Sequence, residues 1–346
     1  MKPNLSNPAT IATGLVALLG APLALRAQER VLPIDEQGVE SPRVTPRSNS
    51  EGAEFLLLPV GARAVGMGGA VTGMRGTGEL VLWNPASVAS LSESRLLFNH
   101  SDGAFDTRSE VLAFLAPAGG IGTLAVTYYL VDTGESTSTD ASGAIQGTIN
   151  FRNQEFMLSF SRAVFGSLEA GVNYKLIQLI FRCNGICNGQ SSFTRTTHAV
   201  DLGLIYNDLG GLPVSVGGSI RHLGFPLRGL SEEDPLPTRV RVGVAYHALS
   251  AFTSDSTLSL ALAVDLEDRW RDVGDPDVMV GSELSVAHRF FIRAGYAFLE
   301  ETGLGGPSLG IGLTYDWFYV DFSRGFDDIS AATGEEAVQV AFGVIF

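Results

Sequence analysis

The stretch AVQVAFGVIF (337–346) decides the fold, because its large apolar side chains fall on every second position. One face carries Val338, Val340, Phe342, Val344 and Phe346. The opposite face carries mostly smaller or polar side chains, namely Ala337, Gln339, Ala341, Gly343 and Ile345. A period of two is that of a β-strand with two different faces.

The same alternation recurs along most of the chain, for example in LSLALAVDLE (258–267) and RVRVGVAYH (239–247). We therefore expect fourteen strands. They fall near 93–101, 107–116, 120–131, 152–162, 166–181, 194–207, 212–223, 237–249, 256–267, 277–287, 290–299, 307–315, 317–324 and 335–346.

The connections between these strands alternate in length. Long ones lie near 132–151, 182–193, 224–236, 268–276, 300–306 and 325–334, and only the first, 102–106, is shorter than its class. Short ones lie near 117–119, 163–165, 208–211, 250–255, 288–289 and 316. Outer-membrane barrels have short periplasmic turns and long outer loops, whereas a soluble sandwich or propeller has no reason for this pattern.

We therefore expect an all-β, transmembrane antiparallel barrel over residues 92–346, in contact with outer-membrane lipid. The sheet must close, because unpaired backbone groups are not tolerated in the bilayer core. The terminal Phe346 is typical of chains that the barrel-insertion machinery receives. The expected location is the outer membrane of a bacterial cell.

Composition limits the remaining possibilities. The chain has 346 residues, a mean hydropathy of +0.20 and a net charge of −14. Residues 1–27 predict a signal peptide that is cleaved after Ala27. Without Lys2 and Arg26, 21 basic and 37 acidic side chains remain, a charge of −16. This acidity argues against a nucleic-acid partner.

Two segments separate the signal peptide from the barrel. Residues 28–54 are polar, contain three prolines and predict a disordered leader. Residues 55–91 mix apolar residues with seven glycines. Since glycine lets a backbone pass close to other side chains, we expect this segment to plug the lumen. The alternative is a flexible periplasmic linker.

Residues 55–91 also resemble a known family. The motifs are Gly61-Ala62-Arg63-Ala64, Gly66-Met67-Gly68-Gly69-Ala70 and Trp83-Asn84-Pro85-Ala86, and LPTRVRVGVAY (236–246) adds a weaker likeness. They are similar to the N-terminal signature of PorV/PorQ-type outer-membrane proteins, relatives of the FadL-like transporters. The resemblance implies a fourteen-stranded barrel with an N-terminal plug. Arg75–Glu79 replaces an acidic pair common in the family, and Ser87 replaces a glycine.

The resemblance implies two kinds of function. The first is a non-enzymatic conduit or binding barrel for hydrophobic small molecules. The alternative is a protein-interaction component of a type IX-like secretion pathway that receives the tails of exported proteins. We expect no enzyme activity and no cofactor, since none of the five histidines lies in a nucleophile signature.

Charged residues predicted on the inner face should pair with one another or with water, because lipid would oppose them. They are Lys175, Asp201, Arg221, Arg239, Arg241, Asp265, Glu283, Arg293 and Asp321. We also expect Arg63 of the plug to pair with one of these acids.

Three further expectations concern the outer loops. Cys183 and Cys187 enclose three residues and predict a local disulfide, as exported chains meet oxidising surroundings. The acidic run at 267–277 predicts a solvated loop and not a metal site. The stretch TGESTSTDASG (133–143) is of low complexity and predicts a mobile loop.

Overall fold

The computed structural model describes residues 51–187, 189–228, 233–249, 257–299, 305–327 and 337–346. The expected signal peptide and residues 28–50 of the expected leader lie outside these ranges. Residues 51–54 do not continue the disordered leader as predicted: the Gly52 N–H donates to the Pro235 carbonyl at 2.8 Å, and Glu51 pairs with Arg239. These contacts hold residues 51–54 against the wall, which the polar composition of the leader did not indicate.

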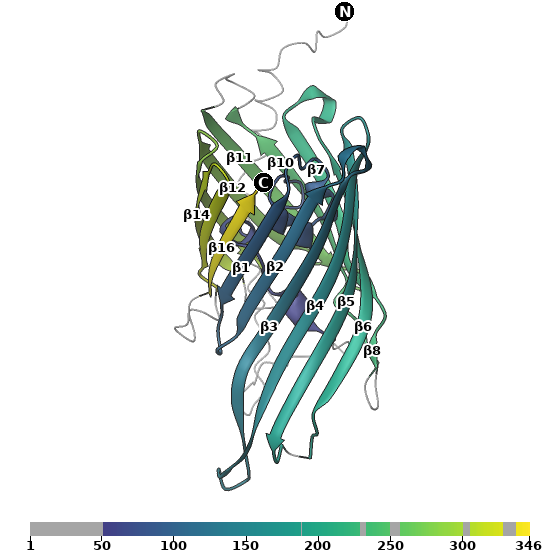
Figure 1. Cartoon of the computed structure of the whole chain (residues 1–346), viewed down its shortest axis with the longest axis vertical. Coiled ribbons are helices and arrows are strands. Elements are labelled where there is room, and N and C mark those ends of the chain that lie inside the picture. The colour runs from purple at the N-terminus through teal and green to yellow at the C-terminus, as the bar shows by residue number, and fades with distance from the viewer. Residues whose placement is uncertain (1–50, 188, 229–232, 250–256, 300–304, 328–336) are drawn as a thin grey trace, which may run out of the picture. The chain divides into compact units, whose positions relative to one another are not determined.

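Within the described residues, fourteen antiparallel strands form a closed barrel (Figure 1). They are β1 (Arg95–Asp102), β2 (Arg108–Pro117), β3 (Thr123–Thr139), β4 (Ile145–Phe165), β5 (Leu168–Gly185), β6 (Phe193–Tyr206), β7 (Val214–Gly224), β10 (Arg239–His247), β11 (Leu258–Arg269), β12 (Asp277–Val286), β13 (Phe290–Phe298), β14 (Gly306–Tyr315), β15 (Phe318–Gly325) and β16 (Ala337–Ile345). β8 (Leu227–Arg228) and β9 (Glu233–Asp234) form a separate small hairpin.

Each barrel strand pairs with its neighbour in the chain, and β1 pairs with β16 to close the sheet. Ser94 and Phe346 exchange two backbone hydrogen bonds beside this seam. The fold prediction is confirmed, including the number of strands. We call the end of the barrel that contains this seam contact and the short connections the turn end, and the opposite end the loop end.

The alternation of the sequence becomes the two faces of the wall. Val340 and Phe342 are exposed on the outside, whereas Gln339, Ala341 and Gly343 are buried on the inside. Leu262 and Val264 are likewise exposed, while Ala261, Ala263 and Asp265 are buried. The outside is thus apolar and the inside mixed, as the period of two predicts.

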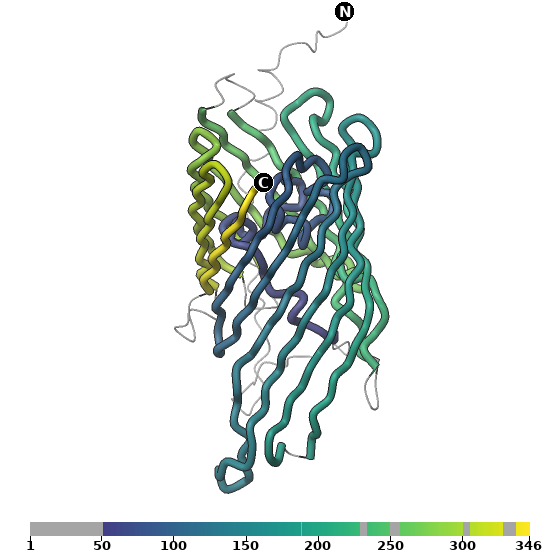
Figure 2. The backbone as a smooth tube through the Cα atoms, in the orientation of Figure 1, coloured from purple at the N-terminus to yellow at the C-terminus, as the bar shows by residue number. Residues whose placement is uncertain are grey.

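Three strands, β3, β4 and β5, are longer than expected, whereas β6 has the expected 14 residues. β3 to β6 continue beyond the other strands at the loop end, and we call this part the extension (residues 132–153 and 178–198) (Figures 1 and 2). The prediction of a loop at 132–151 was therefore largely wrong, whereas at 182–193 only residues 182–185 and 193 belong to strands. Asp132 Oδ1 accepts from Gly134 N and Asn150 Nδ2, so side chains stabilise the hairpin that composition alone indicated to be mobile.

Cys183 and Cys187 form a disulfide at the loop end of β5. Their bond encloses the start of the short connection to β6.

Residues 51–91 lie inside the barrel and are called the inner segment (purple in Figures 1 and 2). It contains four short helices, η1 (Glu54–Leu57), α2 (Ala62–Gly66), η2 (Gly78–Leu82) and η3 (Pro85–Val88). It runs from the loop end, where Glu51 meets Arg239, to the turn end, where it joins β1. None of the helices in the described ranges combines the length and apolar character needed to span a bilayer.

Candidate functional site

Where the inner segment passes, the inner face of the wall has three glycine pairs, each formed by glycines directly opposite one another on neighbouring strands. The pairs are Gly171 with Gly203, Gly217 with Gly243, and Gly281 with Gly295. Without side chains, each pair leaves a flat patch of backbone. The inner segment rests on all three patches.

Each patch receives a different part of the inner segment. Asn84 and Pro85 lie on the first patch, Thr72 and Gly73 on the second, and Met67 and Gly68 on the third. A Cβ atom added to any of the six wall glycines would overlap a neighbouring atom. At five of them that atom belongs to the inner segment, and at Gly243 it is first the Asp265 carboxylate and then Thr72. The wall is therefore shaped to the backbone that it encloses.

Asn84 links two turns of the inner segment to the wall. It begins η3, because its Oδ1 accepts from Ala86 N at 3.0 Å and Pro85 fixes the first helical position. Its Nδ2 donates to the Thr72 carbonyl at 2.8 Å and to the Leu204 carbonyl of β6 at 3.2 Å. A fully buried amide thus uses both its oxygen and its nitrogen.

Arg63, at the start of α2, forms the predicted ion pair with a lumen acid. Its Nε and Nη2 donate to the two carboxylate oxygens of Glu283 on β12, both at 2.7 Å. Glu283 Oε2 also accepts from Arg293 Nε at 2.7 Å, and Arg293 in turn pairs with Asp321. A bidentate geometry of this kind fixes position as well as charge.

Arg63 also holds the inner segment to itself. Its Nη1 donates to the Arg75 carbonyl and to Thr77 Oγ1, both at 3.1 Å. The next buried group is Glu79 of η2, whose Oε1 accepts from Ala64 N at 3.1 Å. Burial raises the pKa of this carboxyl from 4.5 to about 7, and the nearby Asp321 adds to the shift.

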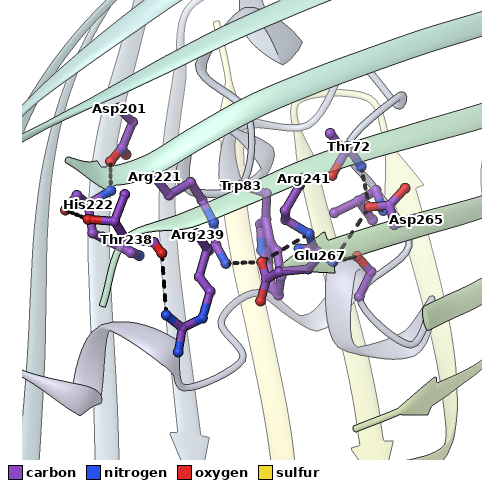
Figure 3. A network of polar contacts seen from close by, with 12 residues as sticks. Thr72, Trp83, Asp201, Arg221, His222, Thr238, Arg239, Arg241, Asp265 and Glu267 are labelled. Atoms are coloured by element: carbon purple, nitrogen blue, oxygen red, sulfur yellow. Dashed lines mark hydrogen bonds and ion pairs between the residues drawn. The ribbon is translucent and has the colours of Figure 1, made fainter. Parts of the chain in front are cut away.

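A second network surrounds Trp83 (Figure 3). The guanidinium groups of Arg221 and Arg241 lie 5.1 and 4.8 Å from the centre of its ring, a cation–π arrangement. Both arginines also pair with Glu267, at 2.7 and 3.2 Å. The Trp83 Nε1–H donates to the Val60 carbonyl at 2.8 Å, so every face of the ring has a partner.

Asp265 connects this network to the glycine-rich part of the inner segment. Its Oδ2 accepts from Val71 N at 3.0 Å and Thr72 N at 2.9 Å, as Figure 3 shows for Thr72. Arg241 lies 3.6 Å from the same oxygen and donates to the Gly69 carbonyl at 3.0 Å. The wall therefore binds backbone N–H groups with an acid and a backbone carbonyl with a base.

A third network lies on β4 to β7. Lys175 Nζ is 2.9 Å from Asp201 and 3.4 Å from Glu155, and all three are almost fully buried. Asp201 also accepts from His222 N at 2.8 Å, at a bulge where β7 departs from regular pairing. Asn173 Nδ2 bonds both Asp201 and the Val81 carbonyl at 2.9 Å, and so joins the network to the inner segment.

All nine charged residues expected on the inner face are buried and form ion pairs. The buried residues of the expected plug motif are Gly61, Ala62, Arg63, Gly66, Met67, Gly68, Gly69, Trp83, Asn84, Pro85 and Ala86. The sequence did not single out the partners Glu51, Glu155 and Glu267. Glu267 shares a face with Asp265 in the alternating stretch 258–267, so that signal was present.

An aromatic pocket lies on the inward face of the extension. The Phe181 ring is tilted against Phe151 and stacked on Phe193, with ring centres 5.1 and 5.2 Å apart. These rings, together with Ile149 and Cys187, line a pocket of about 460 Å³. The pocket is at the loop end, beyond the inner segment, and can accommodate a small apolar ligand.

In the ranges that the structure describes, no group of three or more His, Cys, Asp or Glu side chains is arranged to hold a metal ion. The buried carboxylates of the lumen are instead placed beside arginine, lysine or backbone N–H groups.

The fold matches several solved structures at low sequence identity. The Ralstonia pickettii toluene transporter TbuX gives a TM-score of 0.54 at 13% identity, covering 84% of this chain and 98% of that one. The monoaromatic hydrocarbon channel CymD gives 0.54 at 12%, covering 84% and 97%. The Pseudomonas putida toluene transporter TodX gives 0.52 at 11%, covering 83% and 96%. No protein-family model and no curated protein matches the chain. The feature that this chain shares with these structures is the fold, a closed β-barrel.

Proposed function

We propose that this chain is a non-enzymatic outer-membrane barrel that binds small hydrophobic molecules and passes them inward, with the inner segment as its plug. The glycine pairs of the wall carry this proposal. They make a lumen that fits one particular backbone, and that backbone is held by ion pairs and hydrogen bonds without sharing the barrel's β-ladder.

The outward face supports placement in a membrane. Leucine, valine and phenylalanine side chains are exposed on every barrel strand from β1 to β7, for example Phe98, Leu158 and Leu204. A soluble protein rarely exposes so continuous an apolar surface. In an outer membrane these side chains would face lipid, while the charged residues stay inside.

The aromatic pocket supports a hydrophobic ligand. Phe151, Phe181 and Phe193 line this pocket at the loop end, which an outside ligand would reach first, and the Arg195 guanidinium lies 4.7 Å from the centre of the Phe193 ring. The similar structures include a toluene transporter and a monoaromatic hydrocarbon channel. We propose the same class of ligand, small aromatic or aliphatic hydrocarbons, for this chain.

The test is to compare full-length protein with a chain that lacks residues 28–91, both refolded into planar bilayers. The expected result is a larger ionic conductance without the plug, since a fourteen-stranded barrel is wide enough to conduct when empty. Uptake of toluene into vesicles is measured alongside. Circular dichroism confirms that the shortened chain is folded. Equal currents from two folded proteins would contradict the plug.

A role in a type IX-like secretion pathway is the second candidate, and it rests on the PorV/PorQ-type motifs of residues 55–91. It predicts that the loop end binds the tails of exported proteins, with no hydrocarbon uptake. In either case Phe346 is proposed to present the chain to the barrel-insertion machinery.

A further inference from the structure

The outward face of the extension changes character abruptly. The register of β3 to β6 places outward side chains in rows across the four strands. From the turn end these rows read Leu124–Phe160–Val172–Leu202, Val126–Leu158–Tyr174–Val200, Tyr128–Phe156–Leu176–His198, Leu130–Gln154–Gln178–Thr196, Asp132–Arg152–Ile180–Thr194 and Glu135–Asn150–Arg182. The first three rows are mainly apolar, and the last two are polar or charged except at Ile180.

The fourth row marks the boundary between these two regions. Tyr128 Oη donates to Gln154 at 3.0 Å, Gln154 Nε2 donates to Gln178 at 2.6 Å, and Gln178 Nε2 donates to Thr196 at 3.2 Å. Aromatic and amide side chains of this kind are typical of the interface between hydrocarbon and headgroups. The rows beyond it would lie among the headgroups of the outer leaflet.

Two arginines occupy these headgroup rows. Arg152 on β4 and Arg182 on β5 are exposed and diagonal to one another, a geometry that separates backbone positions by about 7–8 Å. Neither forms an ion pair in the part of the chain that the structure describes. The nearby Asp132 is engaged with Gly134 and Asn150. This contrasts with the lumen, where each arginine of the three networks has a carboxylate partner.

Both guanidinium groups border a surface pocket of about 820 Å³. Asn150, Asn184 and Thr148 contribute amide and hydroxyl groups to the same pocket, and the acidic residues Asp132 and Glu135 also line it. Two unpaired guanidinium groups beside hydrogen-bonding side chains are suited to a phosphorylated sugar, because guanidinium binds phosphate in a bidentate manner. The pocket begins at the fifth row, and only the row of Gln154 and Gln178 separates it from the apolar rows, which would accept acyl chains.

We propose that Arg152 and Arg182 form a binding site for the phosphorylated glycolipid of the outer leaflet. The inference rests on the outer-membrane placement proposed above, but not on the transport of any ligand. Phosphate groups bind to the two guanidinium groups, sugar hydroxyls bind to the amides, and the acyl chains lie along Phe156, Leu158 and Tyr174.

The experiment uses the full chain in detergent and measures retained lipid by native mass spectrometry. The ligand is bis-phosphorylated lipid A, compared with the same lipid after removal of both phosphates. We expect the phosphorylated form to bind about tenfold more tightly. Arg152→Gln/Arg182→Gln should abolish this difference, and the double lysine variant should restore part of it.

Arg162→Gln is the matched control, because Arg162 is an exposed arginine on the same face of β4 at the turn end. It should bind lipid A like the wild type. Equal discrimination by the double glutamine variant would overturn the proposal. So would inorganic phosphate that competes as strongly as the lipid, since this would indicate a site for a free anion.

The same variants separate this inference from the proposed function. A chain that discriminates phosphorylated lipid but shows no plug-dependent current contradicts the conduit and supports the lipid site. A chain with plug-dependent current and no discrimination supports the conduit and overturns the lipid site.

Discussion

Charged and aromatic residues have different surroundings in the lumen and in the extension. In the lumen, Arg63, Arg241 and Trp83 are buried and have partners on several sides. In the extension, Arg152 and Arg182 are exposed, and the aromatic rings border open space. The lumen therefore uses these residues to hold a part of its own chain, whereas the extension keeps them available for other molecules.

The two regions also differ in how much a substitution lowers the stability of the folded chain. A buried ion pair leaves an uncompensated charge when one partner is removed, which costs about 3–5 kcal/mol. An exposed side chain at the loop end contributes little to the folded state. Variants of the lumen should thus affect stability and closure, and variants of the extension should affect binding alone.

The largest effect is expected from Arg63→Ala. Glu283 loses its bidentate partner and keeps only Arg293, and the Thr77 contact is lost as well. We expect the free energy that binds the inner segment to the wall to fall by about 3–5 kcal/mol. This loss should appear as a lower melting temperature in detergent and a higher bilayer conductance. If both quantities equalled those of the wild type, the ion pair would not hold the plug.

A smaller effect is expected from Gly217→Ala. The new methyl group would overlap the Thr72 carbonyl, and overpacking of this kind costs about 1–3 kcal/mol. Gly218→Ala is the matched control, because it lies next in the chain and its Cβ would be 3.8 Å from the nearest atom. Conductance should rise for Gly217→Ala alone. A rise in both variants would assign the effect to β7 itself and not to the patch.

In the extension, Phe193→Ala should weaken binding of toluene without changing bilayer conductance. Loss of the stacked ring beside Phe181 removes about 0.5–1.5 kcal/mol, a change of several-fold in affinity. The measurement is equilibrium binding of labelled toluene to detergent-solubilised protein. Thr148→Ala, on the other face of the same sheet, should leave the affinity unaltered. A lower conductance in Phe193→Ala would mean that the two regions are not independent.

The last prediction concerns pH. Because the pKa of Glu79 is raised to about 7 in the folded chain, its protonated form favours folding, and this contribution is present below about 4.5 and lost as the pH rises to 7. Glu79→Gln should therefore stabilise the chain relative to the wild type at pH 8 more than at pH 4.5. Melting temperatures at the two values test this. If the melting temperatures of the variant and the wild type differed by the same amount at both pH values, Glu79 would not titrate in this range.

Much of the barrel could be predicted from the sequence, because one apolar face repeats at a period of two. The alternation in 258–267 and 337–346 gave both the strands and their outward faces. It also placed the nine lumen charges, since a charge on the inward face has few other positions. The long hairpin of β3 and β4 could not be predicted in this way, because its outer half is polar on both faces and resembles a loop in composition.

The contacts between the wall and the inner segment could be predicted only in part. Arg63 was expected to meet a lumen acid, but the choice of Glu283 depends on where α2 lies in the lumen. The glycine pairs could not be predicted from the sequence for a related reason. Gly217 and Gly243 are 26 positions apart, and only the register of β7 with β10 brings them opposite each other.

The seam between β1 and β16 has a consequence for assembly. It joins residues near the start of the wall to the last ten of the chain, so no shorter product can complete the cylinder. A chain that stopped before residue 337 would leave the free edges of β1 and β15 with unsatisfied backbone groups, which invite pairing with other molecules. Pairing of β16 with both β1 and β15 is thus the step that closes the barrel. A chain in which this pairing fails would aggregate through its free strand edges.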